Sequence, residues 1–209
     1  MAKKFNTTAV CIPEEHYMVN IDKRLEDIKK LVDEQKYFTI NRARQYGKTT
    51  TLIALEQYLK KEYYVVSMDF QTFGSAEFKD ENTFALSFAE TFVHLMNEME
   101  ITNEALGDAI GKLELQIDVT NTRFSLKSLF GNLSTICKVS DKPILLLIDE
   151  VDSAANNQVF LDFLAQLRAY YIKRKIRSTF YSVILAGVYD IKNLRIKIRL
   201  EEEHKVNSP

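Results

Sequence analysis

The sequence predicts a three-layer α/β fold, in which a mainly parallel central sheet is flanked by helices. Short β-prone runs alternate with segments whose apolar residues recur at helical spacing, which is typical of parallel sheets covered on both faces. The apolar run from Ile144 to Ile148 has the pattern of a strand buried on both faces. With 209 residues, 46% of them hydrophobic, and only six Gly and three Pro, the chain suits one large core rather than a loop-rich sandwich.

The expected elements follow one another without an internal repeat or linker. Helices are expected where apolar residues recur every three to four positions, and strands where β-branched and aromatic residues cluster. In chain order they are helix 21–34, strand 37–40, helix 49–61, strand 63–70, helices 82–100, 103–116 and 125–137, strand 144–148, helix 157–174 and strand 182–186. We expect residues 21–195 to form the core domain, between an N-terminal segment, 1–20, and a charged tail, 196–209.

The overall charge excludes strong global attraction to polyanions. The chain has 28 basic and 29 acidic residues, for a net charge of −1, so nothing global draws it to nucleic acid or to an anionic membrane. The longest apolar run, 144–148, is far shorter than the ~20 residues that span a bilayer. Cys11 and Cys137 lack the spacing of metal ligands and are expected to be reduced thiols. These features predict a cytoplasmic protein with no membrane partner.

A candidate phosphate loop joins strand 37–40 to the next helix. Its residues are Arg42, Ala43, Arg44, Gln45, Tyr46, Gly47, Lys48, Thr49 and Thr50. The end of the loop matches the pattern G-x-x-x-x-G-K-[ST], with Arg42 in place of the first glycine. Gly47 would let the backbone approach phosphates at a helix N-terminus. Lys48 would lie between the β- and γ-phosphates, and the Thr49 hydroxyl would bind Mg²⁺. The alternative is a basic surface turn.

An acidic pair, Asp149 and Glu150, follows the apolar strand. Ligands of open α/β sheets bind at the carboxyl ends of strands. Asp149 would hold Mg²⁺ through water, and Glu150 would polarise the attacking water. The alternative is a strand that simply ends at two solvated acids. Asp152 either supports the metal or, as we favour, caps the following helix.

Two segments resemble bacterial AAA-like (predicted AAA-ATPase) domain proteins. Residues 37–49 are similar to their phosphate loop, which favours the form R-x-R-Q-x-G-K-T, and residues 147–152 are similar to their Walker B segment. The resemblance covers roughly residues 15–195. It implies an additional-strand P-loop fold, in which one more strand, here 182–186, separates the Walker A strand from the Walker B strand.

The resemblance also implies features beyond these two motifs. A sensor residue follows the inserted strand in such proteins, and Tyr189 and Asp190 are the candidates, with a turn and helix cap as the alternative. Arg42 and Arg44 either touch phosphate or are solvated. Within segment 1–20, Tyr17 or Val19 would contact adenine, unless both serve in packing. Related proteins continue into a fifth strand and a helical lid, so we expect this chain to be truncated before that lid.

The motifs together predict an ATP-binding P-loop domain, a Mg²⁺-dependent ATPase that hydrolyses the β–γ bond, with Lys48 and Glu150 as catalytic residues. The alternative is a nucleotide-gated regulatory or binding module with little turnover. It would act on DNA or on a protein partner, or form a homo-oligomer. The basic run at 173–177 is the limited support for nucleic-acid binding, unless it is the solvated end of a helix. No guanine-reading N-K-x-D element occurs, which favours ATP over GTP.

Overall fold

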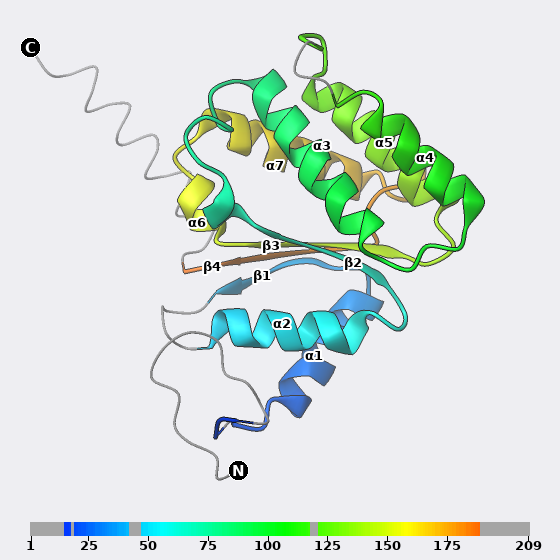
Figure 1. The fold of residues 1–209 in the computed structure, drawn as a ribbon. Coiled ribbons are helices and arrows are strands. Elements are labelled where there is room, and N and C mark those ends of the chain that lie inside the picture. The colour runs from blue at the N-terminus through cyan, green and yellow to red at the C-terminus, as the bar shows by residue number, and fades with distance from the viewer. Residues whose placement is uncertain (1–14, 18, 42–46, 118–120, 189–209) are drawn as a thin grey trace, which may run out of the picture.

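The sheet has four parallel strands in the order β1-β4-β3-β2. The computed structural model describes residues 15–17, 19–41, 47–117 and 121–188. The strands are β1 (Tyr37–Asn41), β2 (Tyr64–Asp69), β3 (Ile144–Asp149) and β4 (Ser182–Gly187). The predicted α/β fold with a parallel sheet is therefore confirmed, and the last described strand in the chain lies between β1 and β3, as the resemblance implied (Figure 1).

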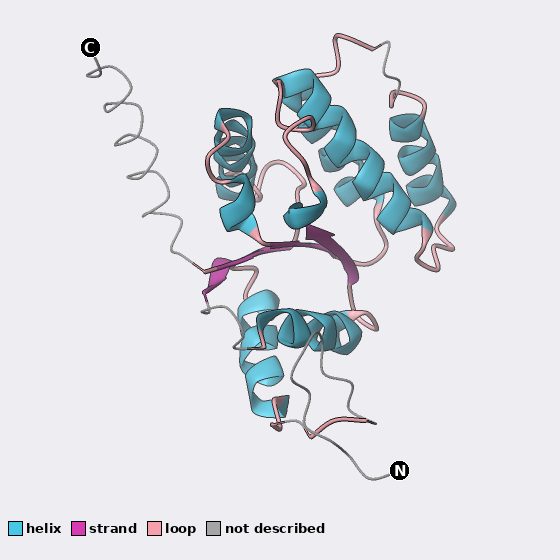
Figure 2. Cartoon of the chain, turned by 60° about the vertical axis from the view of Figure 1, so that its left-hand side comes forward, coloured by secondary structure: helices cyan, strands magenta, loops and turns pink. Residues whose placement is uncertain are grey.

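Helices cover both faces of the sheet. One face carries α1 (Asp22–Asp33) and α2 (Lys48–Leu59). The opposite face carries a thicker layer, and Figures 1 and 2 show the sheet between the two layers. The helices of this second layer are α3 (Glu81–Asn97), α4 (Glu104–Glu114), α5 (Leu126–Val139) and α7 (Gln158–Ile172).

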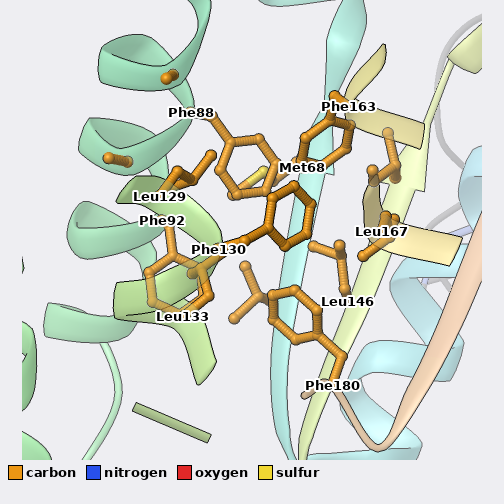
Figure 3. Close-up of a cluster of buried hydrophobic side chains, with 14 of the residues drawn as sticks. Met68, Phe88, Phe92, Leu129, Phe130, Leu133, Leu146, Phe163, Leu167 and Phe180 are labelled. Atoms are coloured by element: carbon orange, nitrogen blue, oxygen red, sulfur yellow. The ribbon is translucent and has the colours of Figure 1, made fainter. Parts of the chain in front are cut away.

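The two faces of β3 contribute to two separate cores. Leu146 and Ile148 belong to the larger core, under α3, α5 and α7, whereas Leu145 and Leu147 belong to the smaller core, under α1 and α2. This division follows from the period of two in a strand. Figure 3 shows Leu146 among aromatic side chains of the larger core, including Phe88, Phe130 and Phe163. The apolar run that predicted this strand is thus buried on both faces.

The parallel register brings the carboxyl ends of the four strands to one edge of the sheet. Asp69 is paired with Asp149, and Asn41 is paired with Gly187. We call this the carboxyl edge, and the side where the strands begin the amino edge. Two short elements that the sequence did not predict lie at the carboxyl edge. They are η1 (Phe70–Thr72) and α6 (Val151–Ala154).

The other boundaries differ from the expected ones by only a few residues. Helix α7 ends at Ile172, so the basic residues 173–177 follow the helix instead of forming its end. No helix among the described residues has the length and apolar character needed to cross a membrane. The expected tail, 196–209, lies outside the described residues.

Candidate functional site

The start of α2 is fixed by a glycine in a left-handed conformation. Gly47 is the N-cap residue of α2, with φ 68° and ψ 30°. An added Cβ would meet no atom within 4 Å, so the backbone conformation, and not crowding, favours glycine here. The Gly47 carbonyl accepts hydrogen bonds from the backbone N–H of Thr51 at 2.9 Å and from its hydroxyl at 2.8 Å. The backbone at Gly47 therefore leads directly into a helix whose first residue is Lys48.

The end of β3 is also shaped by a left-handed residue. Glu150, with φ 54° and ψ 39°, immediately follows the buried Asp149. A non-glycine residue adopts this conformation at a cost of ~1–3 kcal/mol, and such residues cluster at functional sites. The Glu150 N–H donates to Oδ1 of Asp149 at 2.7 Å, and the Ser153 hydroxyl donates to the Glu150 carbonyl at 2.7 Å. These bonds hold the turn that carries both carboxylates.

Lys48 joins the two predicted motifs. Its Nζ lies 3.0 Å from Oδ1 of Asp149 and 2.5 Å from Oε1 of Glu150. The Lys48 residue is only 8% exposed, whereas the Glu150 side chain is 29% exposed. The structure thus brings one buried ammonium and two carboxylates together at the carboxyl edge, even though β4 separates β1 from β3.

The positive and negative charges of this trio do not cancel when all three groups are ionised. Burial disfavours the Lys48 ammonium, but its hydrogen bonds to Glu150 and Asp149 outweigh burial, so the pKa of Lys48 is raised above the ordinary 10.5. Burial raises the pKa of Asp149 above the ordinary 3.8, and the nearby Glu150 carboxylate acts in the same direction, against the hydrogen bond from Lys48. One cation faces two acids, so the ionised trio carries an excess negative charge that favours a second cation.

Asp152 has a different role from the expected helix cap. Glu150 is the residue that precedes α6, and Asp152 lies inside that helix. The Asp152 carboxylate accepts a hydrogen bond from the backbone N–H of Val188, just after β4. A Cβ on Gly187 would lie 2.7 Å from Oδ2 of Asp152 and 2.8 Å from Cγ2 of Val151. The end of β4 is therefore held tightly against α6. The signal in the sequence was a glycine at a strand end, which often marks such a close approach.

Only some of the remaining candidate residues lie in the described part of the structure. Thr49 and Thr50 lie in the first turn of α2, with Thr49 exposed. Tyr17 and Val19 are both exposed, so a packing role for Val19 is not supported, and adenine contact stays a prediction. The other candidates lie outside the described residues: Arg42, Ala43, Arg44, Gln45, Tyr46, Tyr189 and Asp190.

The described residues contain no group of three or more His, Cys, Asp or Glu side chains that could hold a metal ion. Mg²⁺ does not need such a group, because it is usually bound by one or two carboxylates together with water and substrate phosphates. The chemistry of Asp149 and of the exposed Thr49 hydroxyl fits a magnesium ion that arrives with a phosphate ligand.

Three features together define a P-loop-like α/β domain. They are the helix that follows β1 and is capped by a glycine, the acidic pair that follows β3, and the strand that lies between β1 and β3. The chain belongs to the AAA-like domain family, whose model matches residues 15–196. This family is of the nucleotide-binding P-loop type, so nucleotide binding is its general property. Comparison with curated proteins gave no match, and comparison with solved structures gave none.

Proposed function

We propose that this domain binds ATP with Mg²⁺ at the carboxyl edge of the sheet and hydrolyses the β–γ phosphate bond. The observation that carries the proposal is the position of Lys48 between Asp149 and Glu150. A phosphate-binding lysine, a metal-binding carboxylate and a water-orienting carboxylate must converge on one phosphoryl group in such a reaction. Lys48 is in direct contact with both carboxylates.

The N-terminus of α2 is suited to phosphate. The first N–H groups of a helix have no partner within it and carry a partial positive charge. Gly47 provides no side-chain acceptor for them, so they remain suitable for phosphate oxygens. We infer that Arg42 to Tyr46 complete the loop, with Gly47, Lys48, Thr49 and Thr50 at its helical end.

Mg²⁺ would be held by the Thr49 hydroxyl and, through water, by Asp149. The metal would neutralise charge on the β- and γ-phosphates. The carboxylate of Asp149 is largely buried and anchored by Lys48 and by the Glu150 N–H, so it is already oriented. Few side chains then need to be ordered when a nucleotide binds.

Glu150 would orient the attacking water and accept its proton. Its side chain is the most exposed of the trio, so water can reach it, and the left-handed backbone at Glu150 directs the chain away from the strand. Lys48 carries three N–H donors and would stabilise charge on the transferring phosphoryl group while keeping one carboxylate contact. An arginine from a partner would raise the rate further, by ~10³–10⁵ in comparable systems.

A second candidate function is a nucleotide-gated module with little turnover. The Lys48–Glu150 contact favours it, because phosphate oxygens would compete with Glu150 for the same ammonium. Release of Glu150 would free the residue that precedes α6, and α6 contacts the end of β4 through Asp152. Nucleotide occupancy would then change the surface around α6, as in other ligand-ordered switches.

A thermal-shift panel tests nucleotide binding. ATP with Mg²⁺ at ~100 times its Kd stabilises a protein by ~2.7 kcal/mol, which for a chain of this size raises Tm by roughly 5–10 °C. Lys48→Ala should abolish the shift, and the matched control Lys112→Ala, an exposed lysine of α4, should retain it. An unchanged Tm of the wild type in excess ATP, GTP and ADP would refute the proposal. Phosphate release, measured separately, distinguishes the ATPase from the gated module.

A further inference from the structure

The amino edge of the sheet is rich in basic residues, opposite the proposed ATP site. The segments that lead into the four strands are 34–36, 60–63, 140–143 and 173–181. They contain eight basic residues against three acidic ones, although the whole chain has a net charge of −1. The basic residues are Lys36, Lys60, Lys61, Lys142, Lys173, Arg174, Lys175 and Arg177. We call this set the basic strip.

Helix dipoles explain only part of the strip. Helices α1, α2, α5 and α7 end at the amino edge, and a cation near a helix C-terminus is favourable. This effect accounts for isolated lysines near each end. It does not account for four cations within residues 173–177, which follow α7. Within the described part of the chain, none of these four cations forms an ion pair with a carboxylate, so their charge is not neutralised locally.

Two arginines of this segment lie over tyrosine rings. The Arg174 guanidinium is 4.2 Å from the centroid of the Tyr171 ring, and the Arg177 guanidinium is 5.0 Å from that of Tyr170. The rings are themselves fixed: the Tyr171 hydroxyl donates to the Gln35 carbonyl at 2.9 Å, and Tyr170 stacks on Phe130 with centroids 5.0 Å apart. The protein thus presents flat guanidinium groups on rigid supports, a geometry suited to stacking and to phosphate.

The strand order extends the strip across the sheet. Because β4 lies between β1 and β3, the segment before β4 lies between Lys36 and Lys142. The Tyr181 N–H donates to the Ile144 carbonyl at 2.8 Å, and the Ser182 hydroxyl donates to the Lys36 carbonyl at 2.6 Å. With strands ~4.8 Å apart, basic residues recur over at least ~10 Å. A ligand with several regularly spaced negative charges fits this arrangement better than a single anion does.

The chemistry of the strip favours a nucleic acid over a lipid surface. Two large apolar side chains, Ile172 and Ile176, are 63% and 86% exposed there, too few beside eight cations for an apolar face that inserts among lipids. They and the arginine planes can instead contact the faces of unpaired bases. We propose that the basic strip binds single-stranded nucleic acid, with phosphates at the lysines and bases against Arg174 and Arg177. This second site is independent of the proposed ATP site and lies at the opposite edge of the sheet.

Fluorescence anisotropy of the full chain with a labelled single strand of about 20 nucleotides, as DNA and as RNA, tests the proposal. Binding should weaken as salt rises from ~50 to ~200 mM, because phosphate contacts release counterions. A strip variant replaces three cations with Gln: Lys173, Lys175 and Arg177. A control variant makes the same change of charge at three exposed lysines far from these segments in sequence: Lys79, Lys112 and Lys127.

We expect the strip variant to bind at least ~10-fold more weakly. Its log–log salt slope should fall by about 1.4, at ~0.7 for each of the two lysine–phosphate contacts that are lost. The affinity of the control variant should stay within about twofold of the wild-type affinity, because its substitutions do not remove contacts made by the basic strip. Equal losses in both variants would overturn the proposal, as would no binding by the wild type at low salt. Binding to phosphatidylserine vesicles without binding to either oligonucleotide would overturn it in favour of a membrane surface. Circular dichroism of both variants checks that they are folded.

Discussion

The side-chain nitrogen of Lys48 lies 3.0 Å from Oδ1 of Asp149, although the strands that lead to these residues are not neighbours in the sheet. The contact spans the width of β4. Because Glu150 contacts the same nitrogen, one cation holds two acids at the carboxyl edge. Removing any one of these three side chains changes the charge around the other two. The interaction energies within the trio can therefore be measured with substitutions.

Lys48→Ala should lower the free energy of unfolding by ~1–3 kcal/mol at pH 7, because it leaves the largely buried Asp149 beside Glu150 without a counter-ion. Adding Asp149→Asn to this variant should restore at least half of the loss. Chemical denaturation of the wild type, both single variants and the double variant gives the coupling energy. Strictly additive losses would show that the two side chains do not interact energetically.

The cost of Lys48→Ala should also depend on pH. The folded-state pKa of Asp149 is raised mainly by burial, so protonation of Asp149 favours the folded state, and this benefit is lost as pH rises through the raised pKa. Without Lys48 the pKa rises further, so the destabilisation should shrink as pH falls from 7 towards 4. Unfolding free energies of wild type and variant across this range check the sign. A penalty that grows on acidification would contradict it.

Glu150→Gln should separate binding from hydrolysis. The amide keeps the size of the side chain but cannot accept a proton from water, so phosphate release should fall by at least ~10²-fold. The ATP-dependent rise in Tm should remain. Glu90→Gln, on the exposed face of α3, is the matched control and should leave both readouts unchanged. Equal phosphate release by Glu150→Gln and the wild type would show that another group activates the water.

Gly187→Ala should destabilise the domain by ~1–3 kcal/mol, because the added Cβ would clash with Asp152 and Val151 at the end of β4. The matched change is Gly131→Ala in α5, where a Cβ meets no atom within 4 Å. That variant should gain about 0.5–1 kcal/mol from helix propensity. Denaturation curves of the two variants should therefore shift in opposite directions. If the denaturation curves of both variants shift in the same direction, the close packing is not at Gly187.

Cys137 should resist alkylation in the native protein. Burial raises the pKa of its thiol to about 12, so the reactive thiolate is scarce at pH 8. Iodoacetamide should modify Cys137 more than about 100-fold faster after unfolding in guanidinium than before, as measured by peptide mass spectrometry. Because Cys137 is only partly buried, rapid native modification would show that its thiol is reactive in the folded protein.

Much of the fold was predictable because its signals are local. The helical spacing of apolar residues located the long helices, and the uninterrupted apolar run identified β3 as a buried strand. The position of β4 could be predicted only from the resemblance, since a strand carries no local record of its neighbours. The four-residue α6 is too short to show a helical period, and it was missed for that reason.

The sequence motifs named candidate residues for the site but gave no information about their contacts. The motif predicted that Gly47 lets the backbone approach phosphates, but it did not predict the left-handed conformation, with φ 68°, that the structure shows there. Nothing in the residue type of Glu150 reveals its left-handed conformation, because that is imposed by contacts around it. The bond between Asp152 and the backbone of Val188 joins segments that only the folded sheet brings together, so sequence reasoning assigned Asp152 a local cap instead.

The central place of β4 has a consequence for how the domain is made. Within the described sheet, β1 is hydrogen-bonded to β4 alone, and β4 is the last of the described strands to be translated. At ~5–20 residues per second, roughly 7–30 seconds pass between the synthesis of β1 and that of β4. During that interval the nascent chain contains Lys48 but lacks the strand that holds it beside Asp149. The proposed nucleotide site is therefore complete only after β4 has been made, so we expect a nucleotide to stabilise the chain only late in its synthesis.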